Sequence, residues 1–101
     1  MGDRICLKFV DEDGISSPIL YAHWAGKSLI DKANTFYALY KGKTRAESSN
    51  WMVNFISWLR KGEVKDGGYY LYPNEDICDS PDDNGFYKMY LATGKVRKYS
   101  P

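Results

Sequence analysis

The stretch Ile5-Cys6-Leu7-Lys8-Phe9-Val10, near the start of the chain, decides the fold class. Large apolar side chains stand at positions 5, 7 and 9, and this alternation is typical of a strand with one buried face. The next four residues, 11–14, predict a hairpin turn in which Gly14 is free to take a positive φ. The chain then returns as a second strand, predicted from Ile15 to Trp24, in which Pro18 indicates an edge position or an irregular start.

Two helices are predicted after this hairpin. The first begins at Ser28, a favoured N-cap residue, with Asp31 three positions later as an approximate capping box. Ser48 or Ser49 caps the second helix, and Gly62 lies just past its end. Apolar residues recur at three- and four-residue spacing in both segments. They are Leu29, Ala33, Phe36, Tyr37 and Tyr40 in the first helix, and Trp51, Met52, Phe55, Ile56 and Leu59 in the second. Trp58 falls beside the second stripe and is expected to be partly exposed.

The last third of the chain is predicted to form strands again. These strands are Tyr69–Tyr72, Phe86–Leu91 and Lys95–Tyr99, with turns at Asn84-Gly85 and Thr93-Gly94. The order ββααβββ predicts an α+β fold, a two-layer domain in which two helices cover one face of an antiparallel sheet. The length of 101 residues fits a single domain spanning residues 1–101.

Composition narrows the classes of function. The chain has 14 basic and 13 acidic residues, for a net charge of +1, whereas binding to double-stranded nucleic acid usually needs a concentrated basic face. We therefore expect nucleic-acid binding to be disfavoured.

No apolar run approaches the roughly 18 residues of a membrane span, so we expect a soluble, cytoplasmic protein without membrane contact. In that compartment Cys6 and Cys78 fit reduced thiols better than a disulfide.

Several kinds of chemical site do not match the sequence. The cysteines and the single histidine lack the paired spacing of zinc ligands, and the acidic stretch 75–83 lacks the register of a calcium loop. Near the C-terminus, Thr93-Gly94-Lys95-Val96 has valine where a phosphate-binding loop needs serine or threonine. We therefore expect no metal and no cofactor, and we assign no catalytic residue.

The only histidine, His23, stands in the segment Ile19–Gly26, where a strand gives way to a helix start. Strand alternation predicts Tyr21 and His23 on one face and Trp24 on the other. In a functional interpretation His23 is a hydrogen-bonding or acid–base group beside stacking aromatic rings. In a structural interpretation it ties the end of the strand to a loop carbonyl, and the sequence leaves both open.

Nine tyrosines occur in the chain, and six of them crowd the C-terminal strands. In the strand that starts at Phe86, alternation places Tyr87 on one face and Tyr90 on the other. An exposed aromatic face would indicate a ligand platform or a homodimer contact. The alternative is ordinary cross-strand packing of aromatic side chains.

The segment Leu20-Tyr21-Ala22-His23-Trp24-Ala25-Gly26 resembles a Tyr-x-His-Trp-x-Gly motif in a loose set of small, largely uncharacterised microbial and prophage-type proteins. Those proteins similarly continue with helices and a C-terminal β segment that contains an Asp-Asn turn, and Asp83-Asn84-Gly85 occupies the comparable place here. Ala25 stands where the motif would have glycine. The resemblance implies a small accessory or phage-related protein and carries no activity.

Two hypotheses of different class follow. The first is a non-catalytic binding or interaction module with an aromatic sheet face, whose partner is a second copy of the chain, another protein or a small molecule. Its expected binding residues are Tyr21, His23, Trp24, Asp83, Tyr87 and Tyr90. The second is a small hydrolase or nucleotide-processing enzyme, with His23 as general acid or base and Asp83 or Asp82 as its carboxylate partner.

Overall fold

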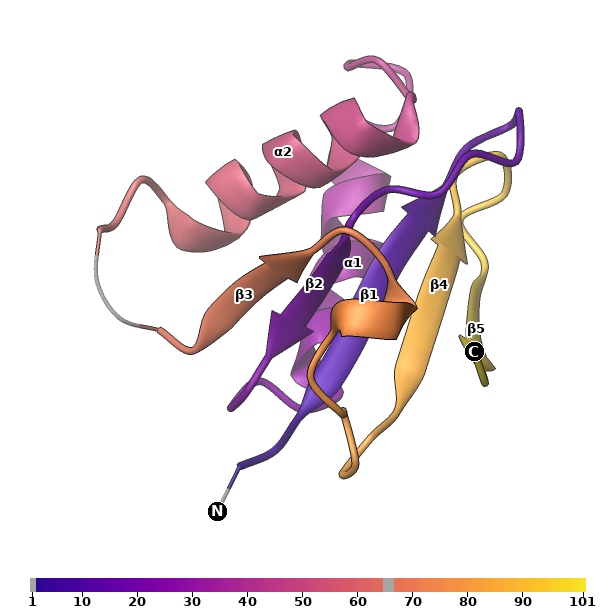
Figure 1. Ribbon diagram of the computed structural model, residues 1–101. Coiled ribbons are helices and arrows are strands. Elements are labelled where there is room, and N and C mark those ends of the chain that lie inside the picture. The colour runs from indigo at the N-terminus through magenta and orange to yellow at the C-terminus, as the bar shows by residue number, and fades with distance from the viewer. Residues whose placement is uncertain (1, 65–66) are drawn as a thin grey trace.

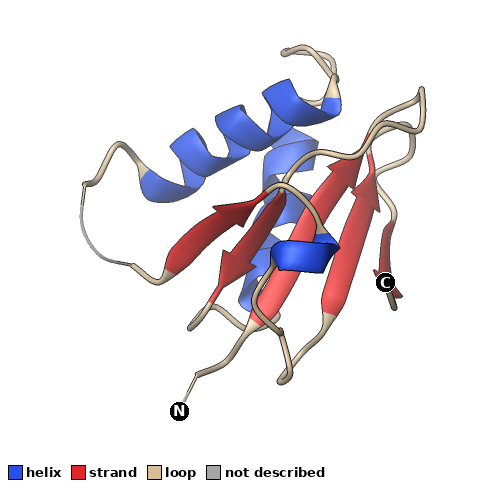
Figure 2. Ribbon diagram, viewed as in Figure 1, coloured by secondary structure: helices blue, strands red, loops and turns tan. Residues whose placement is uncertain are grey.

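Strand β1 (Ile5–Val10) lies at the centre of a five-stranded sheet with the order β3-β2-β1-β4-β5 (Figure 1). The computed structural model describes residues 2–64 and 67–101. The other strands are β2 (Ile19–Ala22), β3 (Tyr69–Tyr72), β4 (Phe86–Tyr90) and β5 (Val96–Tyr99). Helices α1 (Ser28–Tyr40) and α2 (Ser48–Arg60) lie on one face of the sheet, and the short 3-10 helix η1 (Glu75–Ile77) lies on the other (Figure 2). The α+β class and the element order ββααβββ are confirmed.

One strand pair differs from the antiparallel sheet that the sequence suggested. β4 runs parallel to β1, from the pair Cys6↔Phe86 to the pair Val10↔Tyr90, while the other three pairings are antiparallel. The sheet is therefore mixed. Alternation of apolar side chains fixes which face of a strand is buried, but it carries no information on the direction of the neighbouring strand.

The main core lies between the sheet and the two helices. Alternate residues of β1, β2 and β4 face the helices, as the sequence predicted. Phe55 of α2 is fully buried there, with its ring 5.4 Å from that of Phe9 and 5.5 Å from that of Phe36. Trp58 packs at the edge of this cluster and is half-buried, also as predicted. The buried residues of the cluster are Ile5, Leu7, Phe9, Leu20, Ala22, Leu29, Ala33, Phe36, Trp51, Met52, Phe55, Tyr87, Met89 and Leu91.

A second, smaller cluster buries the opposite face of the two strands β1 and β2. Cys6, Ile19 and Tyr21 are its buried members, and Cys78 and Phe86 are among the partly buried side chains that pack on them. Because the segment after β3 crosses in front of the sheet (Figure 1), this face is covered rather than open. The acidic stretch 75–83 therefore takes part in packing through Cys78.

Element boundaries follow the sequence signals closely, with differences at the ends. β2 begins at Ile19, directly after Pro18, so the strand is shorter than the predicted range from Ile15 to Trp24. Helix α1 begins at Ser28, but the Ser28 hydroxyl donates to the Ala25 carbonyl and does not cap the helix. The predicted capping box is therefore wrong. Helix α2 ends at Arg60, and Lys61 rather than Gly62 is the first residue with a left-handed conformation.

The first turn of α2 is capped from another part of the fold. Neither Ser48 nor Ser49 caps the helix with its own side chain; instead the Ser48 amide donates to the Asp11 carboxylate at 3.1 Å. The other carboxylate oxygen of Asp11 accepts from the amides of Asp13 and Ile15 within its own turn. One side chain thus orders the hairpin and anchors the helix, and these amides hold the pKa of Asp11 below its usual range.

No helix among the described residues has both the length and the apolar character needed to cross a bilayer.

We expect Phe55→Ala to lower the free energy of unfolding by about 3–5 kcal/mol, because it opens a cavity among aromatic rings. Chemical denaturation followed by tryptophan fluorescence measures this change. Val53→Ala on the same helix is the matched control, because Val53 is 63% exposed. Its effect should stay within about 0.5 kcal/mol. An equal loss for both variants would contradict the assignment of the core.

We expect Asp11→Asn to lower the urea midpoint of unfolding at pH 7, because the amide side chain keeps one acceptor oxygen where the carboxylate offers two. The folded-state pKa of Asp11 is depressed, so its contribution is present above the unfolded-state pKa and is lost as the pH falls through the folded-state pKa. The difference between the two proteins should therefore narrow below about pH 4. A difference that is constant from pH 7 to pH 2 would contradict this role.

Candidate functional site

Four of the six predicted binding residues come from two segments that are far apart in the sequence, and they lie toward the same end of the sheet. Tyr21 lies in β2, His23 and Trp24 directly follow the end of that strand, and Asp83 lies just before β4, beside Arg4. The remaining two, Tyr87 and Tyr90, belong to β4. The exposed fractions of the six side chains show which of these residues a partner could contact.

Tyr21 and Tyr87 are buried, at 4% and 9% exposure. Tyr87 packs under the helices, and Tyr21 lies beneath the segment that crosses the opposite face. Neither side chain belongs to a surface open to a partner, which corrects the expectation that they would form one. Tyr90 is half-buried on the face opposite the helices, where the Lys88 ammonium lies 5.5 Å from the centre of its ring.

His23 is a junction between three segments. Its backbone N–H donates to the Gly68 carbonyl at 2.9 Å, and its carbonyl accepts from the Asp3 amide at 2.7 Å. The ring Nδ1 lies 2.9 Å from the Tyr21 hydroxyl. Burial raises the pKa of that hydroxyl, so Tyr21 is neutral at physiological pH and fixes the orientation of the imidazole.

Asp83 is bound by Arg4 through two hydrogen bonds. Its carboxylate accepts from the Arg4 amide at 2.9 Å and from the Arg4 Nε at 3.0 Å. These two hydrogen bonds hold the pKa of Asp83 below its usual range, so the group stays ionised and is a poor proton acceptor. Asp82 lies further out, 4.0 Å from the same guanidinium. The hydrogen-bond partner of the His23 ring is therefore a tyrosine and not a carboxylate.

Trp24, which alternation placed on the same face as Leu20 and Ala22, is 60% exposed, whereas those two residues are buried. β2 ends at Ala22, so the strand periodicity no longer applies two residues later. The indole ring packs edge-on against the His23 ring, with 4.4 Å between centroids. It also lies on Gly68, where a Cβ would come within 2.7 Å of the Trp24 ring and where φ is +72°. Glycine is therefore needed to seat Trp24 beside the start of β3.

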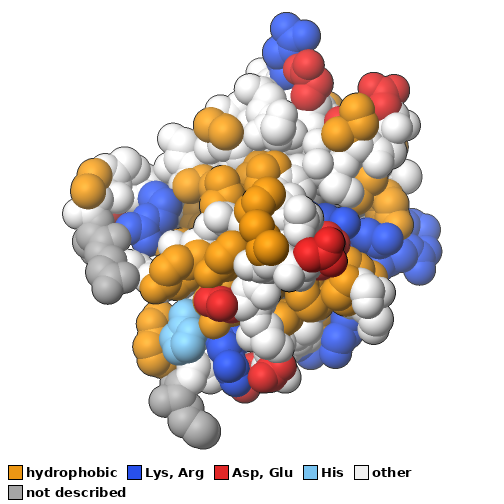
Figure 3. Space-filling model, viewed as in Figure 1, with side chains coloured by type: hydrophobic (Ala, Val, Ile, Leu, Met, Phe, Trp, Pro, Cys, Tyr) orange, Lys and Arg blue, Asp and Glu red, His pale blue; other side chains and the backbone are white. Residues whose placement is uncertain are grey.

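The outer edge of β3 is the most exposed apolar part of the sheet. Tyr70 and Leu71 are each 50% exposed, and β3 pairs with β2 on one side only. Figure 3 shows hydrophobic side chains gathered on this side of the molecule. Neither residue is among the six binding residues that the sequence predicted. The signal that could have identified them is a strand, Tyr69–Tyr72, that carries no charge and no proline.

The other edge strand, β5, has a different chemistry. Its sequence Val-Arg-Lys-Tyr places Arg97 and Lys98 in the middle of the strand, and both are exposed. Charged side chains on an edge strand oppose pairing with a further strand. β3 has no such protection, so the two edges of one sheet differ in their capacity to bind another chain.

The two cysteines meet on the covered face. The Sγ atoms of Cys6 and Cys78 are 3.5 Å apart and both thiols are free, in agreement with the expectation of reduced thiols. Burial raises the pKa of both thiols, that of Cys6 most strongly. Because the thiolate is the reactive form, the raised pKa values disfavour a nucleophilic role. The two side chains pack together and connect the segment after β3 to the sheet.

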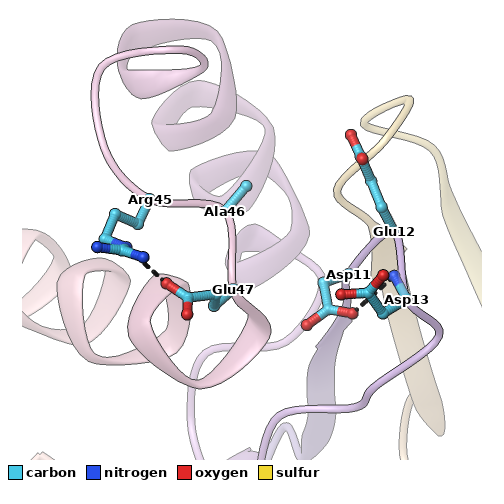
Figure 4. A pocket seen from close by; sticks show the side chains of 6 residues that line it. All are labelled: Asp11, Glu12, Asp13, Arg45, Ala46 and Glu47. Atoms are coloured by element: carbon cyan, nitrogen blue, oxygen red, sulfur yellow. Dashed lines mark hydrogen bonds and ion pairs between the residues drawn. The ribbon is translucent and has the colours of Figure 1, made fainter.

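An acidic cleft of about 420 Å³ lies between the first hairpin and the start of α2 (Figure 4). Arg45 turns toward Glu47 and forms an ion pair of 2.7 Å with it. Asp11 is occupied by the amides described above. Three of the charged side chains that line the cleft, those of Asp11, Arg45 and Glu47, therefore already have partners within the fold.

No protein family, no curated protein and no solved structure matches this chain. Among residues 2–64 and 67–101, no three histidine, cysteine or acidic side chains come together as metal ligands would. The resemblance of the Tyr-x-His-Trp-x-Gly segment to prophage-type proteins stays a prediction.

We expect Tyr21→Phe to lower the free energy of unfolding by about 0.5–1.5 kcal/mol, because the His23 ring loses its hydrogen-bond partner. The same variant should change the NMR signals of the His23 imidazole, because these signals report directly which ring nitrogen carries the proton. Tyr40→Phe is the control, because Tyr40 is exposed on α1. If the imidazole signals of Tyr21→Phe match those of the original protein, the hydrogen bond does not exist in solution.

Proposed function

We propose that this domain is a non-catalytic interaction module that associates with a second copy of itself through the outer edge of β3. The observation that carries the proposal is an edge strand with no charge, on which Tyr70 and Leu71 are half-exposed. Unprotected edge strands bind further strands readily, because their outward N–H and C=O groups lack partners in the sheet.

The pairing of β3 with β2 determines which backbone groups point outward. The bond from the His23 N–H to the Gly68 carbonyl defines a hydrogen-bonded position, and such positions alternate along an antiparallel pair. Gly68, Tyr70 and Tyr72 therefore direct their backbone groups toward β2. Tyr69 and Leu71 direct theirs toward the open edge, where none of the described strands pairs with them.

This pattern suits a symmetric antiparallel pair of β3 strands. With the two-fold axis at Tyr70, Tyr69 of each copy is opposite Leu71 of the other, and the outward N–H and C=O groups of both residues are satisfied. A symmetric dimer uses the same surface on both subunits, so each contact occurs twice. Registers shifted toward the C-terminus would place Pro73, which has no N–H, in the ladder.

The side chains suit the same arrangement. Tyr70 lies on the face opposite the helices, 5.8 Å from the Tyr21 ring, and its partner across the axis would be the second Tyr70. Aromatic cross-strand pairs stabilise antiparallel sheets. On the helix side, a groove of about 390 Å³ beside Leu71 is lined by Ile56 and Tyr69, among others. The Leu71 side chains of both copies would lie along it.

The enzyme hypothesis has no comparable observation in its favour. General acid–base catalysis needs a group within hydrogen-bond reach of the proton that it transfers, and a carboxylate partner would have to contact the imidazole. Asp83 is held by Arg4, and the His23 ring is bound to Tyr21.

We expect the protein to dimerise with a dissociation constant on the order of 10–100 µM, because a short edge pairing buries little surface. Sedimentation velocity across a concentration series measures it. Leu71→Lys should weaken dimerisation at least about tenfold, because it places a buried charge beside the new pairing. Leu71→Pro should do the same by removing one outward N–H while leaving the bonds to β2 intact.

Ile15→Lys is the matched control, because Ile15 is 60% exposed on the first hairpin, away from β3. It should leave the dissociation constant unchanged. A protein that stays monomeric at millimolar concentration, or a dimer that tolerates both substitutions of Leu71, would disprove self-association through β3.

A further inference from the structure

Three cations form a row across the other half of the sheet. The strand register pairs Lys8 of β1 with Lys88 of β4, and Lys88 with Arg97 of β5. Directly paired residues point to the same face, here the face opposite the helices. Neighbouring strands are about 4.8 Å apart, so the row spans roughly 10 Å. Figure 3 shows Lys and Arg side chains gathered on this side of the face.

The row is only partly neutralised. Glu75 of η1 forms an ion pair of 2.8 Å with Lys8. Neither Lys88 nor Arg97 forms an ion pair with a carboxylate of the described residues. Like charges directly opposite one another destabilise a sheet, so Lys88 and Arg97 repel each other across the β4–β5 pair. An anionic ligand would remove the repulsion.

Aromatic rings flank the cations on the same face. Tyr99 lies beside Phe86, with 5.6 Å between ring centroids, and Tyr90 is two residues beyond Lys88. The ammonium groups of Lys8 and Lys88 lie 4.8 Å and 5.1 Å from the centre of the Tyr99 ring. Cations that alternate with half-buried aromatic rings are typical of surfaces that bind single-stranded nucleic acid, where phosphates contact the cations and bases stack on the rings.

We propose that the face of β1, β4 and β5 binds single-stranded nucleic acid, with Lys88 and Arg97 contacting phosphates and Tyr90 stacking on a base. This inference is independent of dimerisation through β3, which lies at the opposite edge of the sheet. It revises the expectation that nucleic-acid binding is disfavoured, which rested on the net charge of the whole chain. The acidic segment that carries Glu75 borders the row and limits the site to a few nucleotides.

Fluorescence anisotropy with a labelled oligothymidylate of about 12 nucleotides tests the proposal, a length within the site sizes of single-strand binders. One phosphate contact contributes about 0.7 to the slope of log K against log salt concentration on single strands, which is a factor of about eight between 1 M and 50 mM salt. At about 50 mM salt, Arg97→Ala should therefore weaken binding about eightfold. Lys88→Ala should have a similar effect, and each variant should lower the salt slope by about 0.7. Tyr90→Leu should weaken binding without changing that slope.

Lys32→Ala is the matched control, because it removes one positive charge from an exposed position on α1, on the other side of the sheet. It should bind as the original protein does, and circular dichroism establishes that all variants are folded. An equal loss for Lys32→Ala and Arg97→Ala, or no anisotropy change at millimolar protein, would overturn the proposal. If tripolyphosphate at equal phosphate concentration displaces the oligonucleotide, the row of cations binds phosphate without recognising bases. That result would also overturn the proposal.

Discussion

β4 lies parallel to β1, and two strands can run parallel only if the chain between them returns to the end where the first began. The segment between β3 and β4 makes this return across the front of the sheet. Its path places Cys78 against Cys6 and Asp83 against Arg4. The covered face of β1 and β2, the arrangement around His23 and the isolation of β3 at an edge all follow from this one parallel pairing.

The covered face explains why the single histidine is a structural junction. A histidine at the end of an open strand would have a free ring, available for acid–base chemistry. Here the returning segment buries Tyr21, and the Tyr21 hydroxyl then fixes the imidazole. Asp83, the carboxylate expected as a partner of His23, is instead bound by Arg4.

The sheet presents two different surfaces because its two edges differ in charge. β3 carries tyrosine and leucine only, so desolvation of its outer edge costs little and its backbone groups are free to pair. β5 carries Arg97 and Lys98, which keep that edge in water. Arg97, which the register pairs with Lys88, also contributes to a local positive surface on a chain whose net charge is only +1.

The sequence by itself determined the elements and their order. The alternation in Ile5–Val10 and the stripe through Trp51 and Phe55 predicted which faces are buried, because local periodicity dictates where apolar side chains point. It could also identify Trp58 as partly exposed. Strand alternation placed Tyr21 and His23 on one face, but Asp83 joined them only through a hypothesis about function, since no local signal connects residues 60 positions apart.

Only the tertiary structure decided the strand order, the direction of β4 and the source of the α2 cap. Ser48 has a cap-forming side chain, yet Asp11 from a distant turn supplies the cap, because a carboxylate with a free oxygen lies within reach of the helix start. In the same way, the sequence counts Lys8, Lys88 and Arg97 as isolated charges, and only strand register makes them neighbours. Strand pairing brings together residues that are far apart in the chain, whereas the periodicity of a single sequence shows only which face of each strand is buried.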